Sequence, residues 1–319
     1  MFLFCFTSQI VAQELYPYAE AASTQPKGVP TVRFAYEHYK ELPSQRGRYF
    51  TGIRVVYGLT HKLTVGVSVT GSNHHRRKFP DGSTGLTNYF QNHHLKSYPQ
   101  NPYQVEGFIA LLKYRFLNID GHQRHFRMAV MGSVAKSFIP HDSAEPRLGD
   151  NSGAEGSWIA TLLLKRFAVS LTNGYIFPAK YKDKSQGIVF QSGNCQYLNV
   201  SLGYRLIPSK YSSYSNVNVN FYLEFITASY GGATMSINGQ PYSFDSYQYY
   251  DKYIYNSLQP NTYSEMRPSL QFILYSTTRI ETGVASPIYN QSYLHFYPMY
   301  FISIHRSFFK VKKNDPKKI

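Results

Sequence analysis

The stretch NVNVNFYLEF, residues 216–225, decides the fold class of this chain. Apolar side chains stand at every second position, and polar or amphipathic side chains stand between them. The first set is Val217, Val219, Phe221, Leu223 and Phe225, and the second is Asn216, Asn218, Asn220, Tyr222 and Glu224. A two-residue period puts each set on its own face of a β-strand, whereas the faces of a helix repeat every ~3.6 residues.

The same period recurs along the chain and predicts twelve strands. They cover residues 32–39, 49–59, 63–70, 107–116, 126–135, 157–165, 167–177, 198–205, 216–225, 269–276, 279–285 and 294–308. Pro298 interrupts the last of them, where we expect a bulge or a local break. An even number of strands is expected for a bacterial single-chain barrel whose two ends lie on the same side of the membrane.

The connections between these strands alternate between short and long. The short ones are 60–62, 117–125, 166, 207–214 and 277–278, and the long ones include 71–104, 139–156, 178–196 and 230–265. A soluble sandwich has no reason to segregate its loops in this way, whereas membrane barrels have short periplasmic turns and longer extracellular loops. The sequence therefore predicts an all-β transmembrane antiparallel up-and-down barrel in the outer membrane of a Gram-negative bacterium.

Composition agrees with a membrane barrel and excludes other classes. Aromatic residues make up 17% of the chain, with 30 Tyr and 22 Phe, yet the mean hydropathy is only -0.36. Beyond the first dozen residues, no stretch approaches the roughly 20 consecutive apolar residues of a transmembrane helix. The net charge of +15 is scattered and lacks nucleic-acid-binding motifs. Outer-membrane lipid and lipopolysaccharide are therefore the expected partners, and nucleic acid is not.

The chain divides into four predicted parts. Residues 1–13 are interpreted as a signal peptide that lacks its basic start, with a buried first strand as the alternative. Residues 14–27 are expected to form a periplasmic N-terminal segment, residues 28–309 the barrel, and residues 310–319 a basic periplasmic tail.

Two stretches resemble a known group of outer-membrane proteins. They are ELYPYAEAASTQPKGVPTVRF, residues 14–34, and YGLTHKLTVGVSVTGSNHH, residues 57–75. Both resemble Bacteroidetes-type barrels of the transporter-like group annotated by similarity to the MetA pathway of phenol degradation. The resemblance implies an outer-membrane conduit for small molecules. It carries over no site residue, because the shared features are topological.

If the apolar faces contact lipid, the opposite faces line a lumen that is rich in basic residues. The basic candidates are Arg33, Arg54, Lys113, Arg115, Arg127, Lys165, Arg205 and Arg279, opposed by Glu37, Glu224 and Glu281. An excess of inward positive charge would favour anionic solutes. The alternative is that these side chains interlock and fill a narrow twelve-stranded lumen.

Other polar clusters give weaker signals. The histidines His74, His75, His93 and His94 have no acidic or Cys ligand at regular spacing, so no metal is assigned. The trio His141-Asp142-Ser143 resembles part of an outer-membrane phospholipase motif, but Ala144 replaces the Asn that follows in that motif. The Tyr-rich stretch 230–265 could cap the barrel or bind a glycan or a partner.

These patterns predict no enzyme and no cofactor. The leading hypothesis is a barrel that passes or binds small anionic or amphipathic solutes of unknown identity. The alternative is a non-conducting accessory subunit of a larger complex with other outer-membrane proteins. A lipid hydrolase built on Ser143 is a remote third hypothesis.

Overall fold

The computed structural model describes most of the chain apart from its two ends and several connections. The described residues are 17–40, 46–75, 102–139, 149–208, 216–242, 258–289 and 298–309. Within these ranges, no helix has the length and apolarity needed to cross a membrane.

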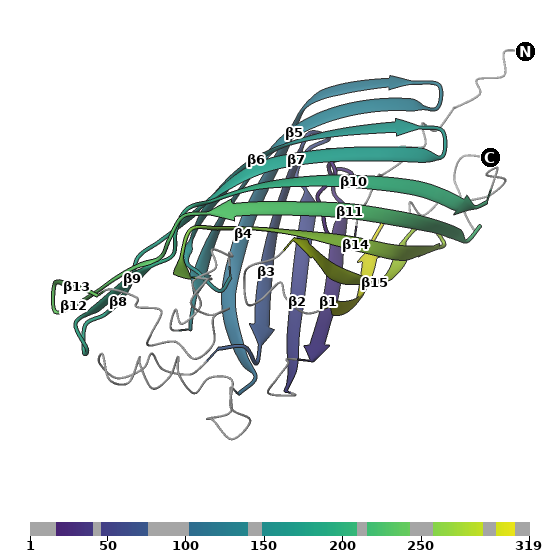
Figure 1. Ribbon diagram of the computed structural model, residues 1–319. Helices are drawn as coiled ribbons and strands as arrows, with labels where there is room; N and C mark the ends of the chain where they lie inside the picture. Colours follow the sequence, from purple (N-terminus) through teal and green to yellow (C-terminus); the bar gives the residue numbers. More distant parts are fainter. Residues whose placement is uncertain are drawn as a thin grey trace, which may run out of the picture.

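Among the described residues, twelve antiparallel strands close into a barrel (Figure 1). They are β1 Pro30–Lys40, β2 Gly47–Gly58, β3 Leu63–Ser72, β4 Gln104–Gly121, β5 Arg124–Ser137, β6 Gly153–Leu164, β7 Phe167–Pro178, β10 Cys195–Ile207, β11 Asn218–Tyr230, β14 Asn261–Leu274, β15 Thr278–Tyr289 and β16 Met299–Ser307. Each pairs with its neighbour along the chain, and β16 closes the ring by pairing with β1, from Thr31 opposite Ser307 to His38 opposite Tyr300. The predicted fold class is confirmed.

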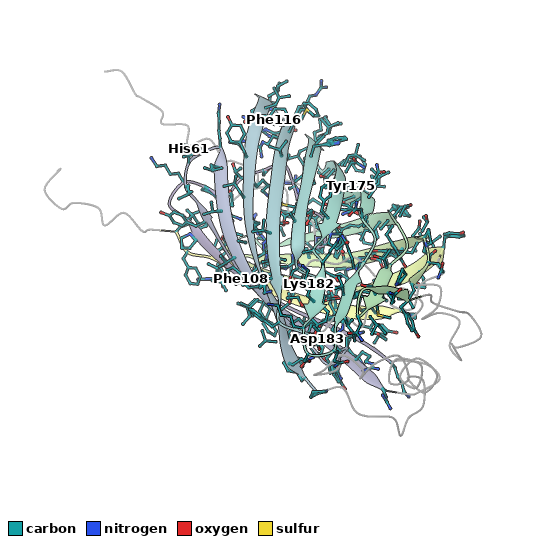
Figure 2. The ribbon with its side chains drawn as sticks, turned by 90° about the vertical axis from the view of Figure 1, so that its left-hand side faces the viewer. His61, Phe108, Phe116, Tyr175, Lys182 and Asp183 are labelled. Atoms are coloured by element: carbon teal, nitrogen blue, oxygen red, sulfur yellow. The ribbon has the colours of Figure 1, made fainter. Side chains whose placement is uncertain are left out.

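The polarity of the wall is the reverse of that in a soluble protein. In β11, Phe221 points outward, while the side chains of Asn220 and Glu224 are buried, Glu224 with no exposed area. In β2, Ile53 is 53% exposed. Figure 2 shows Phe108, Phe116 and Tyr175 on the outer surface of the wall. An apolar exterior around a polar interior is the arrangement of a barrel whose outer band contacts lipid.

One periplasmic turn is much tighter than the sequence indicates. The connection expected over 117–125 shrinks to His122 and Gln123, because a bulge between Arg115 and Leu117 lets β4 continue to Gly121. Gln123, with a φ of 58°, and Lys165, with a φ of 55°, are in the left-handed region that tight turns require.

Two expectations for the extracellular side need correction. The connections 178–196 and 230–265 contain strands: β8 Tyr181–Asp183, β9 Ile188–Gln191, β12 Thr234–Ile237 and β13 Gln240–Tyr242 form a separate sheet beyond the barrel (Figure 1). The final strand, expected over residues 294–308, is described from Met299 to Ser307, and the break expected at Pro298 is present, since proline has no N–H to donate to a ladder; residues 294–297 lie outside the described residues.

Candidate functional site

The N-terminal segment, residues 17–29, lies inside the barrel and is held by side chains of the inner wall. Four of its backbone N–H groups donate to side chains of the wall: Tyr18 and Ala19 to the Glu224 carboxylate at 3.1 and 2.8 Å, Ala22 to Thr161 Oγ1 at 2.9 Å, and Gln25 to Thr64 Oγ1 at 2.9 Å. The acceptors come from β11, β6 and β3. The segment therefore crosses the lumen, which differs from the periplasmic placement expected for residues 14–27.

The composition of this segment explains how it fits. Residues 19–24 read AEAAST, and small side chains allow the backbone to approach the wall closely. Ala22 is fully buried against Ala129 of β5 and Ile159 of β6. A buried irregular chain outside a sheet needs partners for its N–H groups. Here Ser, Thr and Glu side chains on the wall replace a neighbouring strand.

Glu20 is the acidic centre of the segment. Its carboxylate contacts Arg54 of β2 at 2.5 Å and Lys113 of β4 at 2.9 Å, and Lys113 also donates to the carbonyl of Ala21 at 3.0 Å. Burial alone would raise the pKa of Glu20, but the charges of Arg54 and Lys113 outweigh it and hold the pKa well below its usual value. This anchor is therefore charged at neutral pH, and its contribution is lost only as pH falls below the ordinary carboxyl range.

Arg127 of β5 holds the next part of the segment. Its guanidinium donates to Ser23 Oγ at 2.8 Å, to Asn118 Oδ1 at 2.9 Å and to Asp120 Oδ1 at 3.1 Å. The Thr24 hydroxyl donates to the carbonyl of His61 in the first periplasmic turn at 2.9 Å. These contacts fix residues 23–24 near the periplasmic end of the lumen.

The segment leaves the lumen beside Gly58, the last residue of β2. Gly28 N–H donates to the Gly58 carbonyl at 2.8 Å, and Lys27 and Gly58 form a parallel bridge. A Cβ at position 58 would lie 2.2 Å from the carbonyl oxygen of Pro26, which is too close for any contact.

The substitution Gly58→Ala should therefore loosen the N-terminal segment while leaving the barrel folded. We expect faster cleavage within residues 17–29 by an added protease, because Pro26 must move away from the wall. Gly52→Ala on the same strand is the matched control, since a Cβ there meets nothing within 4 Å. Equal cleavage rates in both variants would contradict the proposed close contact.

Among the described residues, two cavities lie beside the segment inside the barrel. The larger, about 330 Å³, opens toward the extracellular half and is lined by Tyr18, Glu37, Phe50, Arg54, Glu155, Tyr230 and Arg267, among others. The smaller, about 60 Å³, lies toward the periplasm beside Thr31, Val56, Thr64 and His305. Glu20 and Arg54 line both cavities, so their ion pair stands at the division between them.

Arg267 is a lumen residue that the sequence analysis missed. Its guanidinium lies 3.7 Å from the centre of the Tyr18 ring, 2.7 Å from Glu265 and 3.8 Å from Glu37. The predicted strand begins at residue 269, but β14 begins at Asn261. Alternation extended backward from Ser269 and Gln271 would have placed Arg267 on the inner face.

Glu281 of β15 forms a second buried cluster. Its carboxylate has no exposed area and accepts hydrogen bonds from Gln271 Nε2 at 2.8 Å and Ser303 Oγ at 2.5 Å. His305 Nε2 is 2.9 Å away, and the Arg33 guanidinium is 3.5 Å away. Arg33 also donates to the carbonyl of Pro17, so this cluster connects the wall to the N-terminal segment.

Eight of the eleven candidate lumen residues lie in the interior near the segment or beside a cavity. They are Arg33, Glu37, Arg54, Lys113, Arg127, Glu224, Arg279 and Glu281. Arg115 donates to the carbonyl of His61 at the periplasmic rim, and Arg205 is half-buried near the end of β10. Lys165 is exposed in the β6–β7 turn and does not line the lumen, because β6 ends at Leu164.

Comparisons with known proteins agree on the fold. No family model and no curated protein matches the chain. It is similar to the COG4313 outer membrane channel from Pseudomonas putida F1, with a TM-score of 0.55 and 13% identity over 92% of this chain and 100% of that one. Two porins are less similar. The KdgM porin has a TM-score of 0.45 and 7% identity over 88% of this chain and 99% of that one. The NanC porin has a TM-score of 0.44 and 12% identity over 87% of this chain and 98% of that one.

At such low identity, the likeness to the COG4313 channel shows the fold alone. The chain is an outer-membrane β-barrel of this kind. Its closed ladder and its apolar outer band place it in the outer membrane of a Gram-negative bacterium, as the sequence predicts.

Proposed function

We propose that this barrel binds small amphipathic solutes in its lumen and passes them across the outer membrane, with the N-terminal segment as its inner constriction. The observation that carries the proposal is the cavity of about 330 Å³ lined by the inner wall and by Tyr18, Ala19 and Glu20 of the N-terminal segment. This volume is at the lower end of the roughly 300–1,000 Å³ of small-molecule sites.

The lining of this cavity favours amphipathic over simple ionic cargo. Arg54 and Arg267 both face carboxylates at short range, so the interior does not present an unopposed positive ring. Apolar and aromatic side chains complete the lining, among them Phe50, Ile226, Tyr263 and Met299. A solute with an apolar body and one anionic group could contact this surface and compete with a carboxylate for Arg267 or Arg54.

A non-conducting role in a larger assembly is the second candidate. It is favoured by the ion-paired segment across the lumen and by the sheet of β8, β9, β12 and β13, which extends beyond the barrel and offers contact area to other outer-membrane proteins. For both candidate functions, we propose that the scattered basic residues bind phosphate groups of outer-membrane lipid and lipopolysaccharide.

Our proposal also includes three finer assignments. The chain acts without enzymatic chemistry, since Ala144 breaks the phospholipase-like motif; residues 141–143 lie outside the described residues. The barrel is a member of the Bacteroidetes-type MetA-pathway group, supported by the stretches 14–34 and 57–75. Residues 1–13 serve as a signal peptide and 310–319 as a periplasmic tail, also outside the described residues.

Planar-bilayer recording with a liposome uptake assay tests the proposed passage. The wild-type barrel should show a small single-channel conductance, and an amphipathic anion such as a short-chain fatty acid should enter liposomes faster than a neutral sugar of equal size. Gly58→Ala should raise the conductance, and Gly52→Ala should not. If the wild type, Gly58→Ala and Gly52→Ala all show no conductance and no solute uptake, the proposed passage is refuted and the accessory role is favoured.

A further inference from the structure

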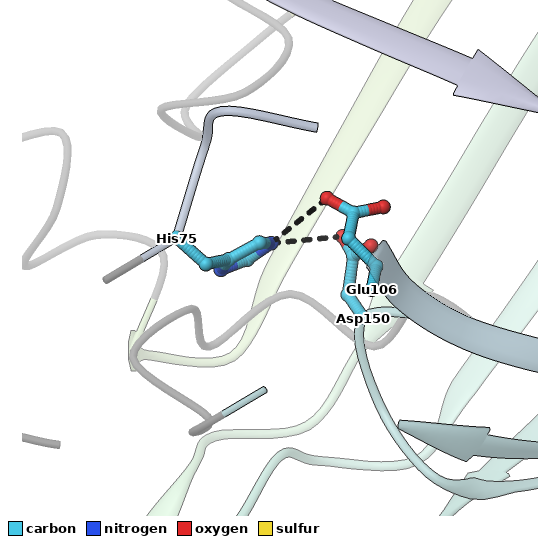
Figure 3. Close-up of side chains that lie close together, drawn as sticks. All are labelled: His75, Glu106 and Asp150. Carbon is cyan, nitrogen blue, oxygen red and sulfur yellow. Dashed lines mark ion pairs between the residues drawn. The ribbon is translucent and has the colours of Figure 1, made fainter. Parts of the chain in front are cut away.

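A second polar cluster lies at the extracellular end of the barrel, away from the N-terminal segment. It consists of His75, which follows β3, Glu106 in β4, and Asp150, which precedes β6 (Figure 3). All three side chains are buried, with 5% or less of their area exposed. Figure 3 shows them converging from three separate stretches of chain.

The local backbone is built to bring the two carboxylates together. A bulge in the β3–β4 pairing leaves Glu106 between Val105, which faces Gly71, and Gly107, which faces Thr70. As a result, Glu106 and Gly107 are both buried, although neighbouring strand residues normally point to opposite sides. Bulges commonly redirect a side chain beside a functional site.

Two glycines then bring Asp150 to Glu106. Gly149 has a φ of +105°, which an L-residue rarely adopts, and a Cβ at Gly107 would lie 2.6 Å from the Gly149 carbonyl oxygen. Only a glycine at position 107 lets the chain before β6 pack this closely on β4. The close approach therefore fixes Asp150 beside Glu106.

The distances fit a metal ion better than a network of direct hydrogen bonds. His75 Nε2 is 3.7 Å from Glu106 Oε1 and 3.7 Å from Asp150 Oδ2, which exceeds the roughly 3.2 Å limit of good N–H···O bonds. All donor atoms of the trio lie within 4.8 Å of one another. Tetrahedral zinc, with bonds of about 2.0–2.2 Å, would hold such atoms roughly 3.4 Å apart.

The surroundings orient the three groups. The Ser72 hydroxyl donates to the Glu106 carboxylate, and Gln104 Nε2 donates to the carbonyl of His75 at 3.2 Å. The neighbouring His74 is held elsewhere, stacked on Phe50 with ring centres 4.0 Å apart. Outer hydrogen bonds of this kind fix metal ligands and tune their affinity.

From this geometry we propose that His75, Glu106 and Asp150 bind a divalent transition-metal ion, with Zn²⁺ as the best fit. One imidazole and two carboxylates supply the nitrogen and oxygen ligands that zinc accepts, and water would complete the tetrahedron. The ion would balance the two buried carboxylates and tie the end of β3, β4 and the start of β6 together at the extracellular rim. The sequence pattern does not reveal the trio, because its acidic members lie far from His74 and His75 in the chain.

Isothermal titration of the untagged, EDTA-treated barrel with Zn²⁺ tests the proposal. The wild-type chain should bind one ion with saturation, and zinc should raise its melting temperature. His75→Ala and Asp150→Asn should each weaken binding by at least about tenfold, since a ligand contributes more than an outer hydrogen bond. His122→Ala, an exposed turn histidine at the periplasmic end, is the control and should bind as wild type does.

Two results would overturn the site. No saturable zinc binding by the wild-type barrel would mean that a buried imidazolium simply bridges two carboxylates. Wild-type affinity in both His75→Ala and Asp150→Asn would place the bound ion elsewhere. Folding of each variant is checked by its heat-modifiable migration in SDS gels. Asp150→Asn keeps the shape of the side chain, so its zinc affinity tests the site if His75→Ala does not fold.

Discussion

Deletion of residues 17–26 should convert the constricted lumen into an open pore with several-fold higher single-channel conductance. The segment binds side chains of β3, β6 and β11 through its backbone and fills the space between the two cavities. The strands continue to pair without it, because none of the twelve uses residues 17–26 as a barrel partner. The barrel should therefore survive the deletion, while its interior fills with water.

The same deletion should make the pore anion-selective. Arg54 and Lys113 lose the Glu20 carboxylate, which lies within 3 Å of each, and so expose positive charge to the new passage. The reversal potential under a KCl gradient measures this shift. Arg127 should contribute less, because Asp120 on its own hairpin stays at 3.1 Å.

Glu20→Gln is the matched control, because it removes the charge and keeps the segment. It should shift the reversal potential in the same direction with a much smaller rise in conductance, as the backbone bonds to Glu224 and Thr161 remain. A deletion variant that folds but conducts no better than wild type would show that another part of the chain sets the constriction.

The sequence was sufficient to predict the wall of the barrel. Alternation such as that of residues 216–225 has a direct physical cause, since one face contacts lipid and the other the interior. The structure confirms it in the burial of Asn220 and Glu224. Strand ends were harder to place, because β4 and β14 continue past their apolar stretches through polar residues that still pair.

The contents of the lumen could not be predicted in the same way. Residues 19–24 have no periodicity, and a short run of Ala, Ser and Thr is equally compatible with an exposed linker. Its position depends on acceptors more than a hundred residues away, as with Ala22 and Thr161. Five of the inward basic candidates lie in the interior, but Glu20, the carboxylate that pairs with Arg54 and Lys113, belongs to a segment assigned to the periplasm.

Loss of the buried carboxylate at position 281 should strongly destabilise the barrel. Glu281→Leu removes the acceptor of Gln271 and Ser303 and leaves the charge of Arg33 and the polar ring of His305 facing an apolar side chain. Removing one member of a buried ion pair costs about 3–5 kcal/mol, because the remaining charge has lost its compensation. Urea unfolding in lipid vesicles, followed by the fluorescence of Trp158, should report a loss of that size.

Two further variants test whether the loss of stability comes from the uncompensated charge of Arg33. Glu155→Gln, outside the Glu281 cluster, is the control: this lumen carboxylate accepts from the Ser133 hydroxyl with one oxygen and from the Tyr197 hydroxyl with the other, and an amide can still accept from one hydroxyl through its oxygen and donate to the other through its NH2 group. It should cost under about 1 kcal/mol. The double variant Arg33→Met/Glu281→Leu should recover part of the loss, because both charged partners are gone. A free energy of unfolding of Glu281→Leu within about 0.5 kcal/mol of the wild-type value would show that the buried cluster contributes nothing to stability. The hydrogen bond from Arg33 to the carbonyl of Pro17 would then be the only structural effect of the cluster.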